Sequence, residues 1–115
     1  MKKYDIVLVD LNPRHGSEQS GFRPCIVLQN NLVNASRLQT VTIAPLTSKI
    51  KYHTFALIVN PSATNNLEGQ SRIEFTQIRT IDQDRIVHVL GSLDKKHQAE
   101  VKEKLMLFFD MDDEF

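Results

Sequence analysis

Short apolar runs separated by polar, turn-forming clusters fill the first ninety residues, a pattern typical of β-strands. The first run, Asp5-Ile6-Val7-Leu8-Val9-Asp10, is rich in β-branched residues and is followed by the turn-forming pair Asn12-Pro13. Further strands are predicted over residues 25–28, 39–46, 54–59, 71–75 and 85–90. The sequence therefore predicts about six short strands.

Two prolines mark expected strand limits. Proline has no backbone N–H, so Pro24 is expected to begin a strand rather than lie inside one, and Pro45 is expected to interrupt the end of the strand over 39–46. In the run 71–75, alternation directs Ile73 and Phe75 inward. His88 alternates with two valines and is expected to face outward.

Two long polar connections interrupt the strands. Residues 14–22 contain Gly16 and Gly21 around four consecutive polar residues, and residues 60–69 form a second loop. Both exceed the usual hairpin connection of 2–5 residues, and long ordered loops are often functional.

The C-terminal part has a helical period instead. Asp94 can cap a helix in which Val101, Leu105 and Phe108 recur at i, i+4 and i+7, and Met106 and Phe109 widen the apolar face. We therefore predict a mainly β (α+β) fold: a single domain over residues 1–115, built as a small, SH3-like β-barrel with one C-terminal amphipathic helix.

Composition narrows the class of protein. The apolar runs, such as Ile6 to Val9, are too short for a membrane span, and no signal-peptide pattern is present. The single cysteine, Cys25, excludes an intrachain disulfide and a Cys-rich zinc site, and fits the cytoplasm. The sequence lacks the common nucleotide, zinc-protease and hydrolase motifs, and its four histidines lack ligand spacing. No metal or cofactor is expected.

The formal net charge of zero hides two unlike parts. Residues 1–109 carry 14 basic and 10 acidic side chains, a balance of +4, whereas the acidic tail, residues 110–115, carries four acids and no base. Such a tail is typically a solvated terminus. Neutrality of the whole chain therefore does not exclude a nucleic-acid partner.

Polar residues gather where the predicted strands begin or end. They form three clusters: Glu18, Gln19 and Ser20 before Arg23; Thr47 and Ser48; and Gln77, Arg79, Thr80 and Asp82. In a small barrel these ends can converge, and an arginine with hydroxyls and amides suits a phosphodiester. Each residue also has an ordinary interpretation: Arg23 in an ion pair with Glu18, Thr47 in a turn, Gln77 in solvent. Spacing alone leaves the function open.

The motifs themselves narrow the choice. The chain reads Asp5-Ile6-Val7, Asp10-Leu11-Asn12-Pro13, Gly16-Ser17-Glu18-Gln19-Ser20-Gly21-Phe22-Arg23-Pro24 and Val27-Leu28-Gln29-Asn30, then Ala44-Pro45-Leu46-Thr47-Ser48 and Gln77-Ile78-Arg79-Thr80-Ile81-Asp82, with Arg85-Ile86 and Gly91 following. In this order the segments resemble the MazF/PemK/Kid-type toxins of type II toxin–antitoxin systems. The resemblance covers nearly the whole chain and also implies the CcdB/PemK-like barrel.

The resemblance implies a metal-independent, ribosome-independent endoribonuclease that cuts single-stranded RNA, typically mRNA, at a short sequence. Arg23 and Thr47 match the catalytic pair, and Ser17, Gln19 and Gln77 match positions that contact RNA. We assign Glu18 a supporting catalytic role ahead of His15, and add Ser20, Ser48 and Arg79 as candidate RNA contacts. Phe22, Tyr52 and Phe55 are candidates for stacking on bases, although Phe55 is expected to belong to the core.

The resemblance also implies partners: a second copy of the chain in a homodimer, and a cognate antitoxin whose acidic segment covers the RNA groove. The alternative is a non-catalytic, CcdB-like toxin that binds DNA gyrase, which the absence of tryptophan and the presence of Arg23 and Thr47 disfavour. A catalytically inactive relative acting as an interaction module is a third reading. The acidic tail could, in addition, compete with RNA for the cations of the groove.

Overall fold

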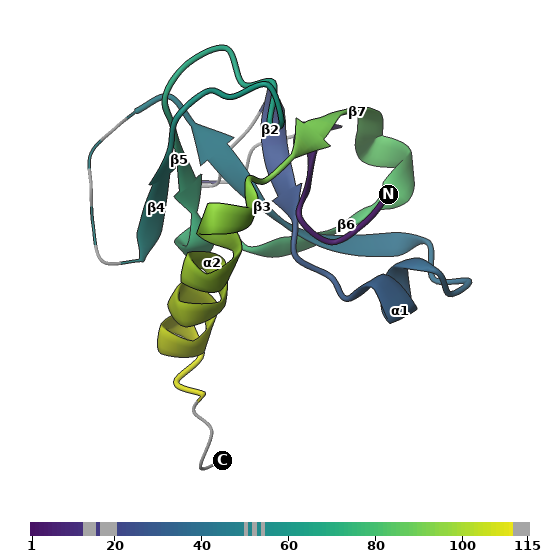
Figure 1. Ribbon diagram of the computed structural model, residues 1–115. Helices are drawn as coiled ribbons and strands as arrows, with labels where there is room; N and C mark the ends of the chain where they lie inside the picture. Colours follow the sequence, from purple (N-terminus) through teal and green to yellow (C-terminus); the bar gives the residue numbers. More distant parts are fainter. Residues whose placement is uncertain (13–15, 17–20, 50, 52, 54, 112–115) are drawn as a thin grey trace.

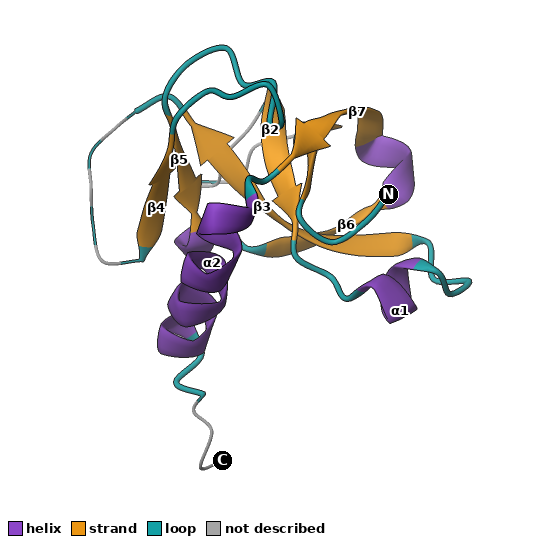
Figure 2. Ribbon diagram, in the orientation of Figure 1, coloured by secondary structure: helices purple, strands orange, loops and turns teal. Residues whose placement is uncertain are grey.

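A strongly bent antiparallel sheet with one long helix packed beside it makes up the fold (Figures 1 and 2). The computed structural model describes residues 1–12, 16, 21–49, 51, 53 and 55–111. The elements are β1 (Asp5–Asp10), β2 (Phe22–Val27), α1 (Asn31–Asn34), β3 (Thr40–Thr47), β4 (Ala56–Val59), β5 (Ser71–Glu74), η1 (Phe75–Gln77), β6 (Arg79–Asp82), η2 (Gln83–Arg85), β7 (Ile86–Ser92) and α2 (Lys95–Phe108).

Strand β3 is the centre of the sheet. The strand order is β4-β5-β3-β2-β1-β7, and β6 also pairs with β3. On the side of β3 away from β2, β6 pairs with the first half, Thr40 to Ile43, and β5 pairs with the end, Leu46 and Thr47. This change of partner along one strand lets the sheet bend around a core. The mainly β fold with a C-terminal helix is therefore confirmed.

Two buried clusters explain why the sequences of β1, β2 and β3 contain nearly continuous runs of apolar residues. The helix-side core contains Ile6, Ile26, Leu28, Ala44, Leu46, Leu57, Val59, Leu67, Ile73, Phe75, Leu93 and Val101. The strand-side core contains Val7, Val9, Leu11, Cys25, Val27, Val41, Ile43 and Ile81. Alternate residues of β1, β2 and β3 enter opposite cores, so both faces of these strands are buried.

Both expectations about proline were wrong. Pro24 is the third residue of β2 and pairs with Leu8, and Pro45 lies inside β3 and pairs with Cys25. The ladder between β2 and β3 begins only at Cys25, so Pro24 is unpaired on that side. At Pro45, the far side of β3 lies between the segments paired with β6 and β5. A residue without an N–H fits where a ladder is interrupted.

The strand β1 and the inward positions of Ile73 and Phe75 are as predicted, although Phe75 begins η1 rather than ending β5. His88 is exposed, as expected. The sequence did not indicate α1 or β6. In β6, only Ile81 is buried, so the strand lacks an apolar run that could be recognised.

Helix α2 begins after Asp94, the expected N-cap residue, and packs its buried Val101 against the helix-side core. Its last turn extends beyond the sheet, where Phe108 is 38% exposed. Phe55 is 39% exposed and meets Phe108 edge-on, with ring centroids 6.1 Å apart. The expectation that Phe55 belongs to the core was therefore wrong, because one ring at the end of the helix covers only part of it. No helix in the described ranges has the length and apolar character needed to cross a membrane.

Candidate functional site

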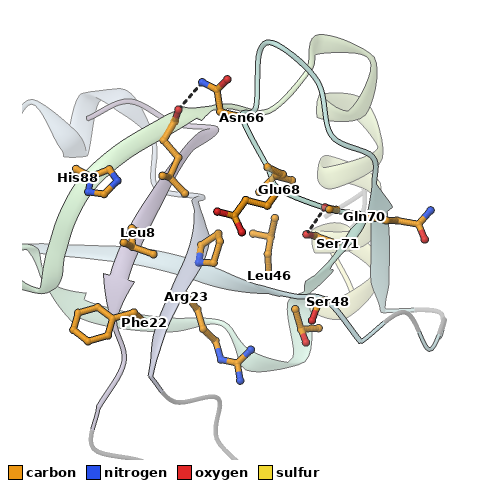
Figure 3. A pocket seen from close by; sticks show the side chains of 15 residues that line it. Leu8, Phe22, Arg23, Leu46, Ser48, Asn66, Glu68, Gln70, Ser71 and His88 are labelled. Atoms are coloured by element: carbon orange, nitrogen blue, oxygen red, sulfur yellow. Dashed lines mark hydrogen bonds between the residues drawn. The ribbon is translucent and has the colours of Figure 1, made fainter.

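Arg23 and Thr47 lie near the ends of two neighbouring strands. Strands β2 and β3 pair from Cys25 and Pro45 onward, so Arg23 and Thr47 each lie two residues beyond the last pair of that ladder. Both residues line one open hollow of about 700 Å³ (Figure 3). The sequence motifs that contain them, 24 residues apart in the chain, thus meet at one place in the fold.

The hollow has two walls. The first, which we call the strand wall, is formed by residues of β1, β2, β3 and β7 and the residue after β3, namely Leu8, Phe22, Arg23, Pro24, Leu46, Thr47, Ser48, His88 and Leu90. The second, which we call the loop wall, belongs to the connection between β4 and β5 and the start of β5, namely Asn66, Leu67, Glu68, Gly69, Gln70 and Ser71. Figure 3 shows the Arg23 guanidinium and the Ser48 side chain in the lower part of the hollow.

The hydroxyl of Thr47 is oriented by the turn that ends β3. Thr47 is 4% exposed, and its Oγ1 accepts a hydrogen bond from the N–H of Lys49 at 3.2 Å. An oxygen that accepts this bond retains its own proton to donate. The turn also leads into exposed Ser48, Lys49 and Lys51, which add two cations directly after Thr47.

A buried ionic network supports the strand wall from the neighbouring strand. Arg72 pairs with Thr47 across β5 and β3, and its Nη2 lies 3.1 Å from the Glu74 Oε2. His53 Nε2 meets the same oxygen at 2.9 Å, while Arg72 Nη1 donates to the carbonyl oxygen of Lys51. Residues 51 and 53 of the connection that follows Thr47 are thereby tied to β5.

The protonation of this network follows from its contacts. His53 Nδ1 accepts the N–H of Phe55 at 3.1 Å, so the neutral ring carries its proton on Nε2 and donates to Glu74. Burial raises the pKa of Glu74, but hydrogen bonds from Thr76 and His53 outweigh it and hold the pKa below its ordinary value. Glu74 is therefore an ionised, hydrogen-bonded carboxylate.

Cys25 lies two residues beyond Arg23 on the same face of β2 and is fully buried. Burial raises the pKa of its thiol to about 12, although the charges of Arg79 and Arg23 oppose this shift. Cys25 is thus a neutral thiol and not a nucleophile. Arg79 pairs with Ile43, which in turn pairs with Val27, so strand alternation puts Arg79 on the same face of the sheet as Cys25 and Arg23.

A side-chain network centred on Asn65 fixes the loop wall. Asn65 is completely buried, and its Oδ1 accepts the N–H groups of Ser62 and Leu67, both at 3.0 Å. Its Nδ2 donates to the carbonyl oxygen of Asn60 at 2.9 Å and to Asp94 Oδ2 at 3.0 Å. All the hydrogen-bonding capacity of the amide is therefore used.

Asp94 and strand β7 also bind the connection between β4 and β5 that forms the loop wall. The Asp94 side chain makes no helix-capping bond; its Oδ1 instead accepts from the Ser62 hydroxyl at 2.8 Å. That bond is the main reason why the pKa of Asp94 is lowered. Asn66 Nδ2 donates to the Leu90 carbonyl at 2.8 Å (Figure 3), and a Cβ at Gly91 would lie 2.4 Å from the Thr64 carbonyl oxygen. Only glycine permits this approach.

Of the predicted site residues that the structure describes, four line the hollow: Phe22, Arg23, Thr47 and Ser48. Phe22 is 63% exposed, so its ring face is accessible. Gln77, at the end of η1, and Arg79, at the start of β6, are half-buried and lie outside the lining. His15, Ser17, Glu18, Gln19, Ser20 and Tyr52, and residues 112–115 of the acidic tail, lie outside the described residues.

Sequence reasoning did not identify the loop wall. The connection over 60–69 was recognised as long and polar, but none of its residues was singled out, because nothing in the sequence shows that Glu68 faces Arg23 and Thr47 across a hollow. Within the described part of the chain, no three His, Cys, Asp or Glu side chains are grouped so that they could hold a metal ion.

Comparison with known proteins identifies the family of the chain. The family model of PemK-like, MazF-like toxins of type II toxin–antitoxin systems matches residues 2–109. The chain is 35% identical to Endoribonuclease MazF of Staphylococcus saprophyticus over 88% of this chain and 84% of that protein. It is 34% identical to Endoribonuclease EndoA of Bacillus subtilis, over 93% and 92% respectively. A solved MazE–MazF structure from Deinococcus radiodurans superposes with a TM-score of 0.74 at 25% identity, covering 97% of each chain.

Proposed function

The chain belongs to the PemK-like, MazF-like toxins of type II toxin–antitoxin systems and is an endoribonuclease, and we propose that Arg23 and Thr47 carry its catalysis. The observation that supports this assignment is that both residues line one open hollow. A forked, permanent cation next to an oriented hydroxyl is suited to a phosphodiester whose charge increases during reaction.

The proposed reaction uses the RNA's own nucleophile. A ribose 2′-OH loses its proton and attacks the adjacent phosphorus in line with the departing 5′-oxygen, which takes up a proton. The bond to the 5′-oxygen breaks, leaving a 2′,3′-cyclic phosphate and a 5′-OH end. Arg23 binds the non-bridging oxygens of the phosphorane, and the Thr47 hydroxyl donates a hydrogen bond to the same group.

The general base is a separate assignment within the proposal. An arginine side chain is a poor proton acceptor, and the Cys25 thiol, with a pKa of about 12, cannot act as the base near neutral pH. We assign Glu18 the supporting role. Ser17, Gln19, Ser20, Gln77 and Arg79 are proposed to contact RNA together with Phe22 and Ser48, and no metal ion takes part.

The biological setting follows from the family. The proposed substrate is single-stranded mRNA in the cytoplasm, and its cleavage stops translation and growth. The proposed partners are a second copy of the chain and a cognate antitoxin that occupies the RNA groove. A CcdB-like, gyrase-binding function is not favoured, since the relatives are endoribonucleases and the chain has no tryptophan.

The decisive experiment is cleavage of a long single-stranded RNA by purified protein in EDTA, with analysis of the ends. We expect discrete cuts with cyclic phosphate and 5′-OH termini, and a loss of about 10²–10³ or more in rate for Arg23→Ala. Arg37→Ala is the matched control, because Arg37 is exposed and does not line the hollow. Equal cutting by Arg23→Ala and wild type would contradict the proposal.

A further inference from the structure

The hollow is larger and more apolar than a phosphate site requires. A volume of about 700 Å³ lies in the range of small-molecule pockets, whereas a phosphate needs only a few donors. Its walls carry apolar side chains from both sides, including Leu8, Pro24, Leu46, Leu67 and Leu90. A flat, weakly polar group beside the phosphate would bury these surfaces, and in RNA that group is a nucleobase.

Glu68 is an unexpected residue in a hollow that receives a polyanion. Figure 3 shows its carboxylate directed from the loop wall into the hollow, above Arg23. Within the described ranges it has no hydrogen-bonding or ion-pair partner, so Arg23 and Glu68 do not neutralise each other. A carboxylate repels phosphate but accepts hydrogen bonds from amino and imino groups on base edges.

The backbone on both sides of Glu68, whose side chain is exposed, is anchored by the loop wall. Its neighbour Leu67 is buried, and the N–H of Leu67 is bound by the fully buried Asn65. On the other side of the connection, Gln70 Nε2 donates to Asn60 Oδ1 at 2.9 Å. A recognition group on a segment fixed in this way loses little conformational entropy when it binds.

We propose that the hollow takes the nucleobase next to the scissile phosphate and that Glu68 selects guanine there. Guanine presents two adjacent donors on its Watson–Crick edge, N1–H and the N2 amino group, which the two oxygens of one carboxylate can accept together. Cytosine, adenine and uracil each present a single donor group next to acceptors, so the carboxylate gains at most one hydrogen bond from them. This inference rests on the proposed RNA cleavage and adds a specificity-determining residue to it.

The test is sequencing of the cut ends from a randomised RNA pool. Wild type is expected to prefer guanine at one position adjacent to the cut. Glu68→Gln is expected to lower the relative use of guanine there about 10-fold or more, because an amide has one acceptor oxygen for the two donors and carries no charge. Preferences at other positions should not change. Glu103→Gln, exposed on α2, is the matched control.

Binding provides a readout apart from cleavage. An RNA with 2′-deoxyribose at the attacking nucleotide cannot be cut, and its affinity can be compared with guanine or adenine at the identified position. Wild type should discriminate between the two RNAs and Glu68→Gln should not, with equal thermal melting of both proteins. Unchanged base preference in Glu68→Gln and Glu68→Ala would overturn the inference. Failure of the proposed function would show differently, as no cutting by wild type or no loss in Arg23→Ala.

Discussion

The two walls of the hollow are built by different physical means. Arg23 and Thr47 stand on strands β2 and β3, whose backbones are fixed by ladders to β1 and β5. Glu68 stands on a connection without regular structure, whose shape depends on a few side chains around Asn65 and Asp94. One wall is determined by the whole sheet, and the other by a local network.

This difference suits the two tasks. Charge stabilisation of a phosphorane needs donors held within a few tenths of an ångström, which a paired strand end supplies. Recognition of a base has to change between relatives without disturbing the chemistry, and a loop held by local side chains can be replaced as a unit. The comparison therefore predicts that substitutions in the strand wall abolish cleavage while those in the loop wall alter stability and sequence preference.

The largest effect is expected for Thr47→Val, which keeps the β-branched shape of the side chain and removes only the hydroxyl. Cleavage should fall about 10²–10³-fold, and Thr47→Ser, which retains the donor, should recover most of it. Single-turnover rates on a fluorogenic RNA measure both. A Val variant that cleaves within twofold of wild type would show that the strand wall does not need this donor.

A smaller but clear effect on stability is expected for Asn65→Ala in the loop wall. The change removes four hydrogen bonds and leaves buried partners unsatisfied, at a cost of about 3 kcal/mol in the free energy of unfolding. Denaturant titration measures the cost. Gln70→Ala, which loses one exposed bond, serves as the control and should cost less than about 1 kcal/mol. Equal costs would contradict the central role of Asn65.

The smallest effect concerns the ionic support of the strand wall, through Glu74→Gln. Because the pKa of Glu74 is lowered in the folded state, its contribution is present above the ordinary value of 4.5 and is lost as pH falls through the lower, folded pKa. The variant should be about 1–2 kcal/mol less stable than wild type at pH 7, and the difference should shrink below about pH 4. Thermal melts at pH 7, 5 and 3 test this. A constant difference would mean that the charge of Glu74 is not the cause.

Sequence patterns predicted much of this fold because buried strands and helices carry regular patterns of apolar residues. Strand β1 is buried on both faces, and helix α2 has a regular apolar period, so both were found. The Arg23 and Thr47 motifs were found through resemblance rather than through periodicity. Strand β6 was missed because three of its four residues are polar, and its position depends on pairing with β3, far along the chain.

The predictions that were wrong or missing share a cause. Each depends on which strand or loop lies next to the residue in the fold, and the local sequence does not show this. Whether proline can lie inside a strand depends on the ladder beside it, and at Pro24 and Pro45 that ladder is interrupted. Asp94 precedes α2, as predicted. Its carboxylate, however, accepts hydrogen bonds from Ser62 and Asn65, which lie 32 and 29 residues earlier in the chain. The place of Glu68 in the wall of the hollow is evident only once the fold brings its loop to the same hollow as Arg23.

Cys25 offers a practical consequence of the strand wall. It is the only thiol of the chain, it lies two residues from Arg23, and with a pKa of about 12 almost none of it ionises near neutral pH while β2 is in place. Alkylating reagents act on the ionised, accessible form. The rate at which iodoacetamide modifies the native protein therefore reports how often the strand that bears Arg23 opens, with no label added. An antitoxin or RNA that closes the hollow should slow that rate. The rate of Cys25 modification in the unlabelled protein therefore measures how much of the hollow is occupied.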